Sequence, residues 1–192
     1  MRNRCFVTLV LFVGVTALAG AQTAKGTPGA PETFTAHANV SKPGAGAVAG
    51  TIQVHIERYT PDFDRNAVET ALKTGGYASF VTALRKAPDV GYVQLGESKT
   101  PIRYARATPS GKGRTIVVVT DKPVYFVGGG AAEAKPRAGF EVALIQMNVD
   151  DIGLGTGTMA GAARVRPGGD AGPQIDDYAE TPIKLTSVTR KM

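Results

Sequence analysis

Two segments near the start of the chain, Glu32–Ser41 and Thr51–Tyr59, have an apolar residue at every second position. These residues are Phe34, Ala36, Ala38 and Val40 in the first segment and Ile52, Val54 and Ile56 in the second. A period of two is typical of a strand with one buried and one solvated face, so both segments are predicted as strands. Lys42–Gly50, which contains a proline and several glycines, is predicted to join them as a hairpin loop.

Between Thr60 and Pro88 the apolar residues follow helical spacing instead. They form two faces, Ala67, Val68, Ala71 and Leu72 in the first and Tyr77, Phe80, Val81 and Leu84 in the second. Thr60-Pro61 predicts the start of a helix, because proline suits the first helical position. Gly75-Gly76 predicts the end of the first helix, and Pro88 predicts the end of the second. A helical hairpin is therefore expected at about residues 61–87.

The rest of the chain returns to strand-like segments separated by turn residues. The predicted strands are Gly91–Leu95, Ile102–Ala107, Arg114–Thr120, Val124–Val127, Phe140–Val149, Thr156–Val165 and Ile183–Thr189. Ile116–Val119 is apolar at consecutive positions, so this strand is expected to be covered on both faces, with the helical hairpin as one cover. The pattern as a whole predicts a mainly β (α+β) fold, an antiparallel sheet forming a barrel or sandwich with one helical hairpin inserted after the second strand.

The first residues of the chain have the three parts of a cleavable signal peptide. Arg2 and Arg4 precede an apolar run of 13 residues, Phe6–Leu18, and Ala19-Gly20-Ala21 supplies small residues for cleavage after Ala21. The run is shorter than the roughly 20 residues that a membrane span needs, and no later segment is apolar for long enough to span a bilayer. We expect an exported protein, periplasmic or extracellular, with no transmembrane segment in the mature chain.

The predicted organisation is therefore a signal peptide over residues 1–21, a flexible linker over 22–31 and a single β-rich domain over 32–192. Cys5 is the only cysteine of the chain, and it precedes the cleavage point. The mature chain is thus expected to contain no disulfide, and thiol catalysis is excluded.

Basic residues gather in one part of a mildly basic chain. The formal net charge is +6, of which Arg2 and Arg4 contribute two, and Asp121 is the one acid among the basic residues between Lys99 and Lys122. Such a run forms either a solvated strand face or a contact surface for an anionic envelope component. The candidate contact residues are Arg103, Arg106, Lys112 and Arg114.

The two histidines are the best candidates for site chemistry. His37 and His55 both fall on the polar faces of their predicted strands. A register that pairs Val40 with Ile52 would set them opposite each other, with Cβ atoms roughly 5 Å apart, whereas other permitted registers separate them by one or two residue pairs. With Glu57 nearby, the pair could hold zinc or copper or serve a hydrolase; the alternative is two exposed histidines on a solvated sheet.

Other motifs do not reach the spacing that their chemistry requires. No Gly-x-Ser-x-Gly sequence is present, and Gly111–Thr115 lacks the upstream glycine of a phosphate-binding loop. Gly153–Gly161 contains several glycines but precedes a strand, which excludes a dinucleotide fingerprint. The sequence therefore predicts no cofactor. It also predicts no nucleic-acid binding, since there is no tryptophan and no basic stripe with interleaved aromatic residues.

Several stretches together resemble a group of uncharacterised exported bacterial proteins. They are ALKTGG at Ala71–Gly76, DVGYVQLG at Asp89–Gly96, TPIRYARA at Thr100–Ala107, the GxGTG-like stretch at Gly153–Gly157 and the acidic lead-in at Asp176–Tyr178. The resemblance covers most of the mature chain. It implies a location in the bacterial envelope and brings no assigned activity and no known site residues.

Three functions are compatible with these observations. The leading expectation is a non-catalytic, envelope-associated binding or scaffold domain, because a complete strand pattern occurs without assembled catalytic groups. The second is a barrel that carries a small apolar ligand, and the third is a metal-binding protein or hydrolase that uses the two histidines.

Overall fold

The computed structural model describes residues 29–42, 46–125 and 137–191. The elements, in chain order, are β1 Glu32–Lys42, β2 Gly46–Ile56, α1 Asp62–Lys86, β3 Gly91–Leu95, β4 Ser98–Ser110, β5 Gly113–Thr120, β6 Val142–Asp150, β7 Leu154–Pro167, the short 3-10 helix η1 Gly169–Ala171, β8 Pro173–Tyr178 and β9 Ile183–Lys191. The predicted mainly β fold is confirmed.

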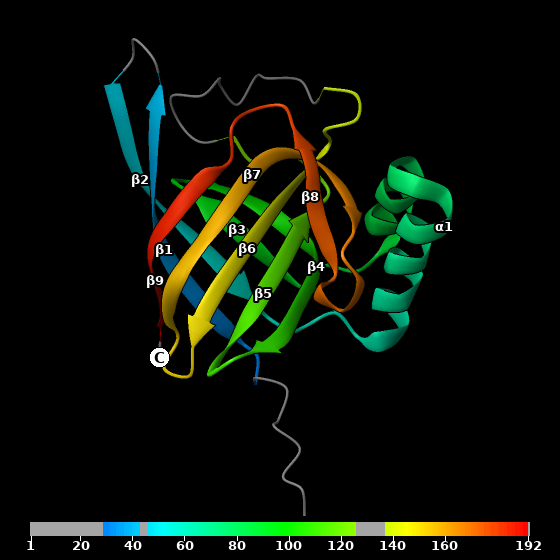
Figure 1. Cartoon of the computed structure of the whole chain (residues 1–192), viewed down its shortest axis with the longest axis horizontal. Helices are drawn as coiled ribbons and strands as arrows, with labels where there is room; N and C mark the ends of the chain where they lie inside the picture. Colours follow the sequence, from blue (N-terminus) through cyan, green and yellow to red (C-terminus); the bar gives the residue numbers. More distant parts are fainter. Residues whose placement is uncertain (1–28, 43–45, 126–136, 192) are drawn as a thin grey trace, which may run out of the picture.

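Eight of the strands close into an antiparallel barrel (Figure 1). The strand order is β6-β5-β4-β3-β2-β1-β9-β7, and the pairing of β7 with β6 completes the ring. β7 is long enough to pair along one edge with two strands, first with β9 and then with β8. Of the two predicted architectures, the barrel is thus the one that forms, and β8 extends the sheet beside it.

The interior of the barrel is built by the alternation seen in the sequence. In the β1–β2 hairpin Phe34 pairs with Val54 and Ala36 with Ile52, so their apolar sides coincide. Inward-facing side chains from all eight barrel strands join in one buried apolar cluster. Each large aliphatic side chain buried in this way contributes about 1.5–3 kcal/mol. The cluster is the main source of stability of the barrel.

β5 is buried on both of its faces, as its unbroken apolar run predicts. Ile116 and Val118 belong to the barrel interior, whereas Val117 and Val119 belong to a second cluster outside the barrel. That second cluster also contains the buried side chains of α1, among them Phe80. α1 is therefore the cover on the outer face of this part of the barrel.

α1 is interrupted at Gly76, which has φ 68° and ψ −165°. The amide of Thr60, before the helix, donates to a β4 carbonyl at 2.9 Å, and the carbonyl of Ala87, after it, accepts from a β4 arginine. Both ends of α1 therefore lie beside β4. The hydroxyl of Tyr77, beside the break, donates to a carbonyl of β7 at 3.0 Å. The chain therefore reverses at Gly76, and the predicted helical hairpin is present as two arms of α1.

Several sequence-based assignments differ from the structure, among them the predicted second strand, which ends at Ile56 and not at Tyr59. The predicted strand Val124–Val127 is wrong at Val124 and Tyr125, which are irregular, and its other two residues lie outside the described part. β8 was not predicted as a strand because turn-forming residues precede it and acidic residues dominate it. β2 begins at Gly46, inside the predicted loop. The glycine and alanine residues there have no apolar alternation, so the sequence pattern did not indicate that the strand extends this far.

The predicted signal peptide and most of the predicted linker, residues 1–28, lie outside the described residues. Within residues 29–42, 46–125 and 137–191, no helix combines the length and apolar composition that crossing a membrane requires.

Candidate functional site

A shallow groove of about 300 Å³ lies on the outer side of β2, β3 and β4. Its lining residues are His55, Glu57, Asp89, Gly91, Tyr92, Lys99 and Pro101. Five of them come from these neighbouring strands, which the register aligns by pairing His55 with Tyr92 and Tyr92 with Pro101. The other two, Glu57 and Asp89, lie directly after β2 and before β3. The alternation that points Val54 and Val93 into the barrel points these side chains outward.

At Gly91, in the floor of the groove, the backbone of β3 lies close to that of β2. Its φ is 155°, and a Cβ at this position would lie 2.0 Å from the carbonyl oxygen of His55. No side chain fits in that space, so glycine is required for β3 to pair with β2 here.

Tyr92 is held between two nitrogen-containing side chains. Its ring lies 4.9 Å from the His55 ring, centroid to centroid, and the Lys99 ammonium lies 4.4 Å from the Tyr92 centroid. A hydrogen bond of 2.8 Å joins Thr33 Oγ1 to His55 Nδ1 and fixes the orientation of the imidazole. The groove thus has a preorganised centre with an aromatic ring, an imidazole and a primary ammonium.

The two histidines are not brought together. β1 and β2 pair His37 with Thr51 and His55 with Thr33, so three residue pairs lie between the histidines along the hairpin. The register has the parity that the alternation requires, but it separates the histidines further than the one or two residue pairs expected. Among the residues that the structure describes, no three His, Cys, Asp or Glu side chains lie close enough together to hold a metal ion. Of the three predicted metal ligands, His55 and Glu57 line the groove and His37 does not.

Three of the four candidate basic contact residues form intramolecular ion pairs. Arg103 pairs with Asp89 and Asp121, and Arg106 pairs with Glu69 at 2.8 Å. Arg114 pairs with Glu32 at 2.6 Å and is largely buried. Lys112 is exposed in the turn between β4 and β5. Binding of an anionic partner to this surface stays a prediction. Most of the positive charge of the surface is already balanced by acidic residues of the protein itself.

The pair of Arg106 and Glu69 belongs to a contact between β4 and α1. Glu69 Oε1 also accepts a hydrogen bond of 2.7 Å from the hydroxyl of Tyr104, which is fully buried. Burial, reinforced by the hydrogen bond to Glu69, raises the pKa of Tyr104 well above its ordinary value. This cluster attaches the first arm of α1 to the barrel.

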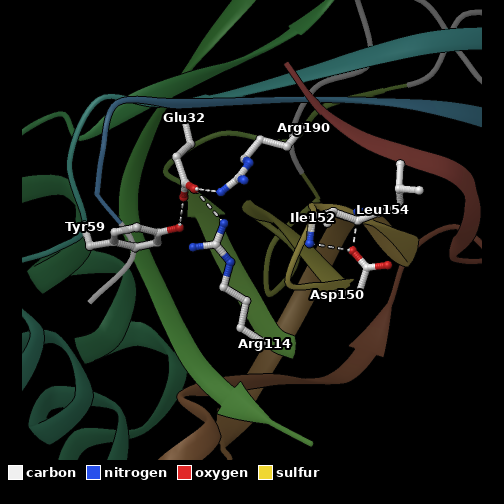
Figure 2. Close-up of polar contacts among 7 residues, drawn as sticks. All are labelled: Glu32, Tyr59, Arg114, Asp150, Ile152, Leu154 and Arg190. Carbon is white, nitrogen blue, oxygen red and sulfur yellow. Dashed lines mark hydrogen bonds and ion pairs between the residues drawn. The ribbon is translucent and has the colours of Figure 1, made fainter. Parts of the chain in front are cut away.

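A second polar cluster lies at one end of the barrel, around the buried carboxylate of Glu32 (Figure 2). Glu32 Oε1 accepts from Arg114 Nη2 at 2.6 Å and from Arg190 Nη1 at 3.2 Å, while Tyr59 donates to Oε2 at 2.6 Å. Burial alone would raise the pKa of Glu32, but the hydrogen bonds from Arg114 and Tyr59 and the charge of Arg114 outweigh it and lower the pKa. Burial and the Glu32 carboxylate raise the pKa of Tyr59 far above its ordinary value.

The turn between β6 and β7 lets Arg190 reach this cluster (Figure 2). Gly153 in the turn has φ 85°, and a Cβ there would lie 2.4 Å from the Cβ of Arg190. Asp150 fixes the turn by accepting hydrogen bonds from the amides of Ile152 and Leu154, at 3.1 and 2.8 Å. Glycine at this position is therefore what allows β9 to bring Arg190 against the turn.

Glu32, Tyr59 and Arg190 are not among the site residues that the sequence predicts. A signal was present, because Glu32 has the same parity as Phe34 and Arg114 has the same parity as Ile116, which places charged residues at inward-facing positions of strands. A charge at such a position requires a partner. The partner could not be named, since Arg114 and Arg190 lie 82 and 158 residues away from Glu32.

The fold and its outer groove define a small antiparallel barrel with a surface site and a helical cover on one side. Compared with known proteins, the chain matches no protein-family model, no curated protein and no solved structure at a significant level. Its function must therefore be argued from its own residues.

Proposed function

We propose that this protein is an exported, non-catalytic binding domain of the bacterial envelope and that it binds its ligand in the groove around His55, Tyr92 and Lys99. The observation that carries the proposal is the preorganised centre of that groove, with Tyr92 fixed between the imidazole and the ammonium. A few fixed polar groups beside an aromatic ring are typical of sites that orient a ligand.

The surroundings of the groove favour binding over catalysis. The His55 Nδ1 atom is hydrogen-bonded to a threonine hydroxyl, so no carboxylate orients the imidazole as it would in a catalytic triad. The outer face continues beside the groove with Gln53 and Gln94, which pair across β2 and β3. Amide side chains both donate and accept hydrogen bonds, and they extend the surface available to a polar ligand.

Export and envelope location are the second part of the proposal. They are supported by the order of Arg2 and Arg4, the apolar run Phe6–Leu18 and the small residues before Gln22. The resemblance to exported bacterial proteins favours the same location.

The proposal is tested by measuring how much mature protein sediments with an envelope fraction of its host. Replacing Tyr92 with alanine removes the central contact, and we expect apparent affinity to fall about five- to tenfold. Tyr178→Ala is the matched control, because Tyr178 is an exposed tyrosine on β8, away from the groove. Protein recovered from the envelope should begin at Gln22, as read by mass spectrometry.

Equal sedimentation of the Tyr92→Ala variant and the wild-type protein would contradict the groove as the binding site. Absence of the wild-type protein from the envelope fraction would contradict the proposed function as a whole.

A further inference from the structure

The groove carries opposite charges at its two ends, and this polarity bears on the class of ligand. Glu57 lies at one end and Lys99 at the other, both exposed. Among the residues that the structure describes, neither side chain is found in an ion pair: the Lys99 ammonium contacts the Tyr92 ring, and the Glu57 carboxylate faces solvent. Each charge is therefore free to pair with a charge on a ligand.

The neighbouring charges preserve this polarity. Asp89 lies beside Glu57, and it is paired with Arg103, which also pairs with Asp121. Arg58 donates to the backbone carbonyl of Asp89 at 2.6 Å. Three carboxylates and two guanidiniums leave this end net negative, whereas Lys99 is the charged residue that lines the groove at the other end.

The strand register sets the separation of the two charges. Tyr92 pairs with His55, and Glu57 follows His55 by two residues, directly after the end of β2, where its amide donates to the carbonyl of Val90 at 2.9 Å. Two residues along a strand span about 6.6 Å, and adjacent strands lie about 4.8 Å apart. Because the Lys99 ammonium lies over the Tyr92 ring on the neighbouring strand, its charge and that of Glu57 are on the order of 10 Å apart.

We propose, on the basis of the binding function above, that the groove binds the free ends of a short unblocked peptide, with its amine at Glu57 and its carboxylate at Lys99. An extended peptide of three residues spans about 10 Å, which matches the separation of the two charges. Between these ends, Gly91, Tyr92 and Pro101 offer a largely apolar floor for the middle of the peptide. His55, whose Nδ1 is engaged by Thr33, leaves its other ring nitrogen for a peptide group of the ligand.

The probes are three forms of trialanine: unblocked, acetylated at the amine, and amidated at the carboxylate. Binding to the mature protein is measured by isothermal titration calorimetry. Exposed ion pairs are weak, so each blocking group should lower affinity for the wild-type protein about two- to fivefold. Raising the salt concentration should reduce these differences, because the charges are exposed to solvent.

Two variants assign each end of the peptide to its residue. The Glu57→Gln variant should bind the unblocked and the acetylated peptide with equal affinity, but it should still bind the unblocked peptide more tightly than the amidated one. Lys99→Gln should show the reverse. Both positions are exposed, so folding should be unaffected, and the thermal midpoint provides the check.

Equal binding of all three peptides to the wild-type protein would overturn the proposal, as would the same loss of discrimination in both variants. Binding of a neutral sugar oligomer, chitotriose, in the absence of peptide binding would also overturn it. If the Tyr92→Ala variant loses envelope binding but trialanine does not bind, the binding function stands and the peptide assignment fails. If the Tyr92→Ala variant binds the envelope normally, the groove is not the binding site, and the peptide assignment fails with it.

Discussion

Glu32 is the residue on which one end of the barrel depends. Its carboxylate is almost completely buried and accepts hydrogen bonds from two arginines and a tyrosine. Removing the charge would leave two guanidiniums close together with no counter-ion, in a place that water enters poorly. An unbalanced buried charge costs far more than the loss of an exposed ion pair.

Replacing Glu32 with glutamine should lower the free energy of unfolding at neutral pH by about 3 kcal/mol. Urea denaturation followed by circular dichroism measures this change. Glu57→Gln is the matched control, since Glu57 is exposed directly after the end of β2 and its replacement should change stability by less than about 0.5 kcal/mol. A similar small change for both variants would show that the cluster is not stabilising.

The effect of the Glu32 replacement should also depend on pH. The folded-state pKa of Glu32 lies below its ordinary value of 4.5, so the folded protein binds this proton less readily than the unfolded chain. The stabilisation is therefore complete above the unfolded-state pKa and is lost as the pH falls through the folded-state pKa. The stability difference between wild type and Glu32→Gln should shrink on acidification below about pH 4.5; a constant difference would contradict the assignment.

At the scale of elements, the break in α1 decides how the helix covers the barrel. The first arm begins beside β4 and the second arm ends beside it, because the chain reverses at Gly76. This residue has φ 68°, a backbone conformation that residues with a side chain rarely adopt. Both arms can then bury their apolar faces, which include Val68 and Leu72 in the first and Phe80 and Leu84 in the second. A straight helix of this length would leave one of these faces without a partner.

Gly76→Ala should therefore lower the free energy of unfolding by at least about 1 kcal/mol, measured by urea denaturation. Lys73→Ala is the neighbouring control, because Lys73 is exposed in the first arm and alanine favours helix. Gly75 is unsuitable, since a Cβ there would lie 2.2 Å from the Oγ and 2.5 Å from the Cβ of Ser79. We expect Lys73→Ala to be neutral or slightly stabilising; an equal loss in both variants would show that the reversal does not depend on Gly76.

At the scale of the whole molecule, the barrel and its helical cover share the same strands. β5 sends alternate side chains into the interior and into the contact with α1, so neither cluster is complete without this strand. This arrangement predicts that the helix and the barrel unfold together.

Leu84→Ala tests this coupling, because Leu84 is fully buried between α1 and the barrel. The substitution should cost about 2–5 kcal/mol, while Thr82→Ala, at an exposed position of the same arm, should cost less than about 0.5 kcal/mol. Unfolding of the Leu84→Ala variant followed by far-ultraviolet circular dichroism and by tyrosine fluorescence should give coincident transitions. Loss of helix at a lower urea concentration than loss of the tyrosine signal would show that α1 is an independent unit.

The spacing of apolar residues and glycines along the sequence was sufficient to predict much of the fold. Alternation in β1 and β2, the double burial of β5 and the helix break at Gly76 were all predicted, because each depends on residues a few positions apart. β8 was missed, since in the described part of the chain it pairs with β7 alone and nothing in its own acidic sequence shows that pairing.

The candidate site was only partly predictable. His55 and Glu57 were candidates as metal ligands, and they do line the groove, but Tyr92 was not predicted to lie beside them. Lys99 was noted only as part of a basic run. The basic residues Arg103, Arg106 and Arg114 were seen as one surface, whereas the structure gives each of them an acidic partner.

The sequence by itself determined which side of each strand is apolar and where the helix reverses, because side-chain periodicity and the freedom of glycine act over a few residues. Tertiary structure alone decided the closure of the barrel, the separation of His37 from His55, the pairing of Glu32 with Arg190 and the assembly of the groove. These features depend on strand register and on contacts between residues far apart in the chain. Many registers satisfy the same alternation, and only the packing of the complete barrel selects one of them.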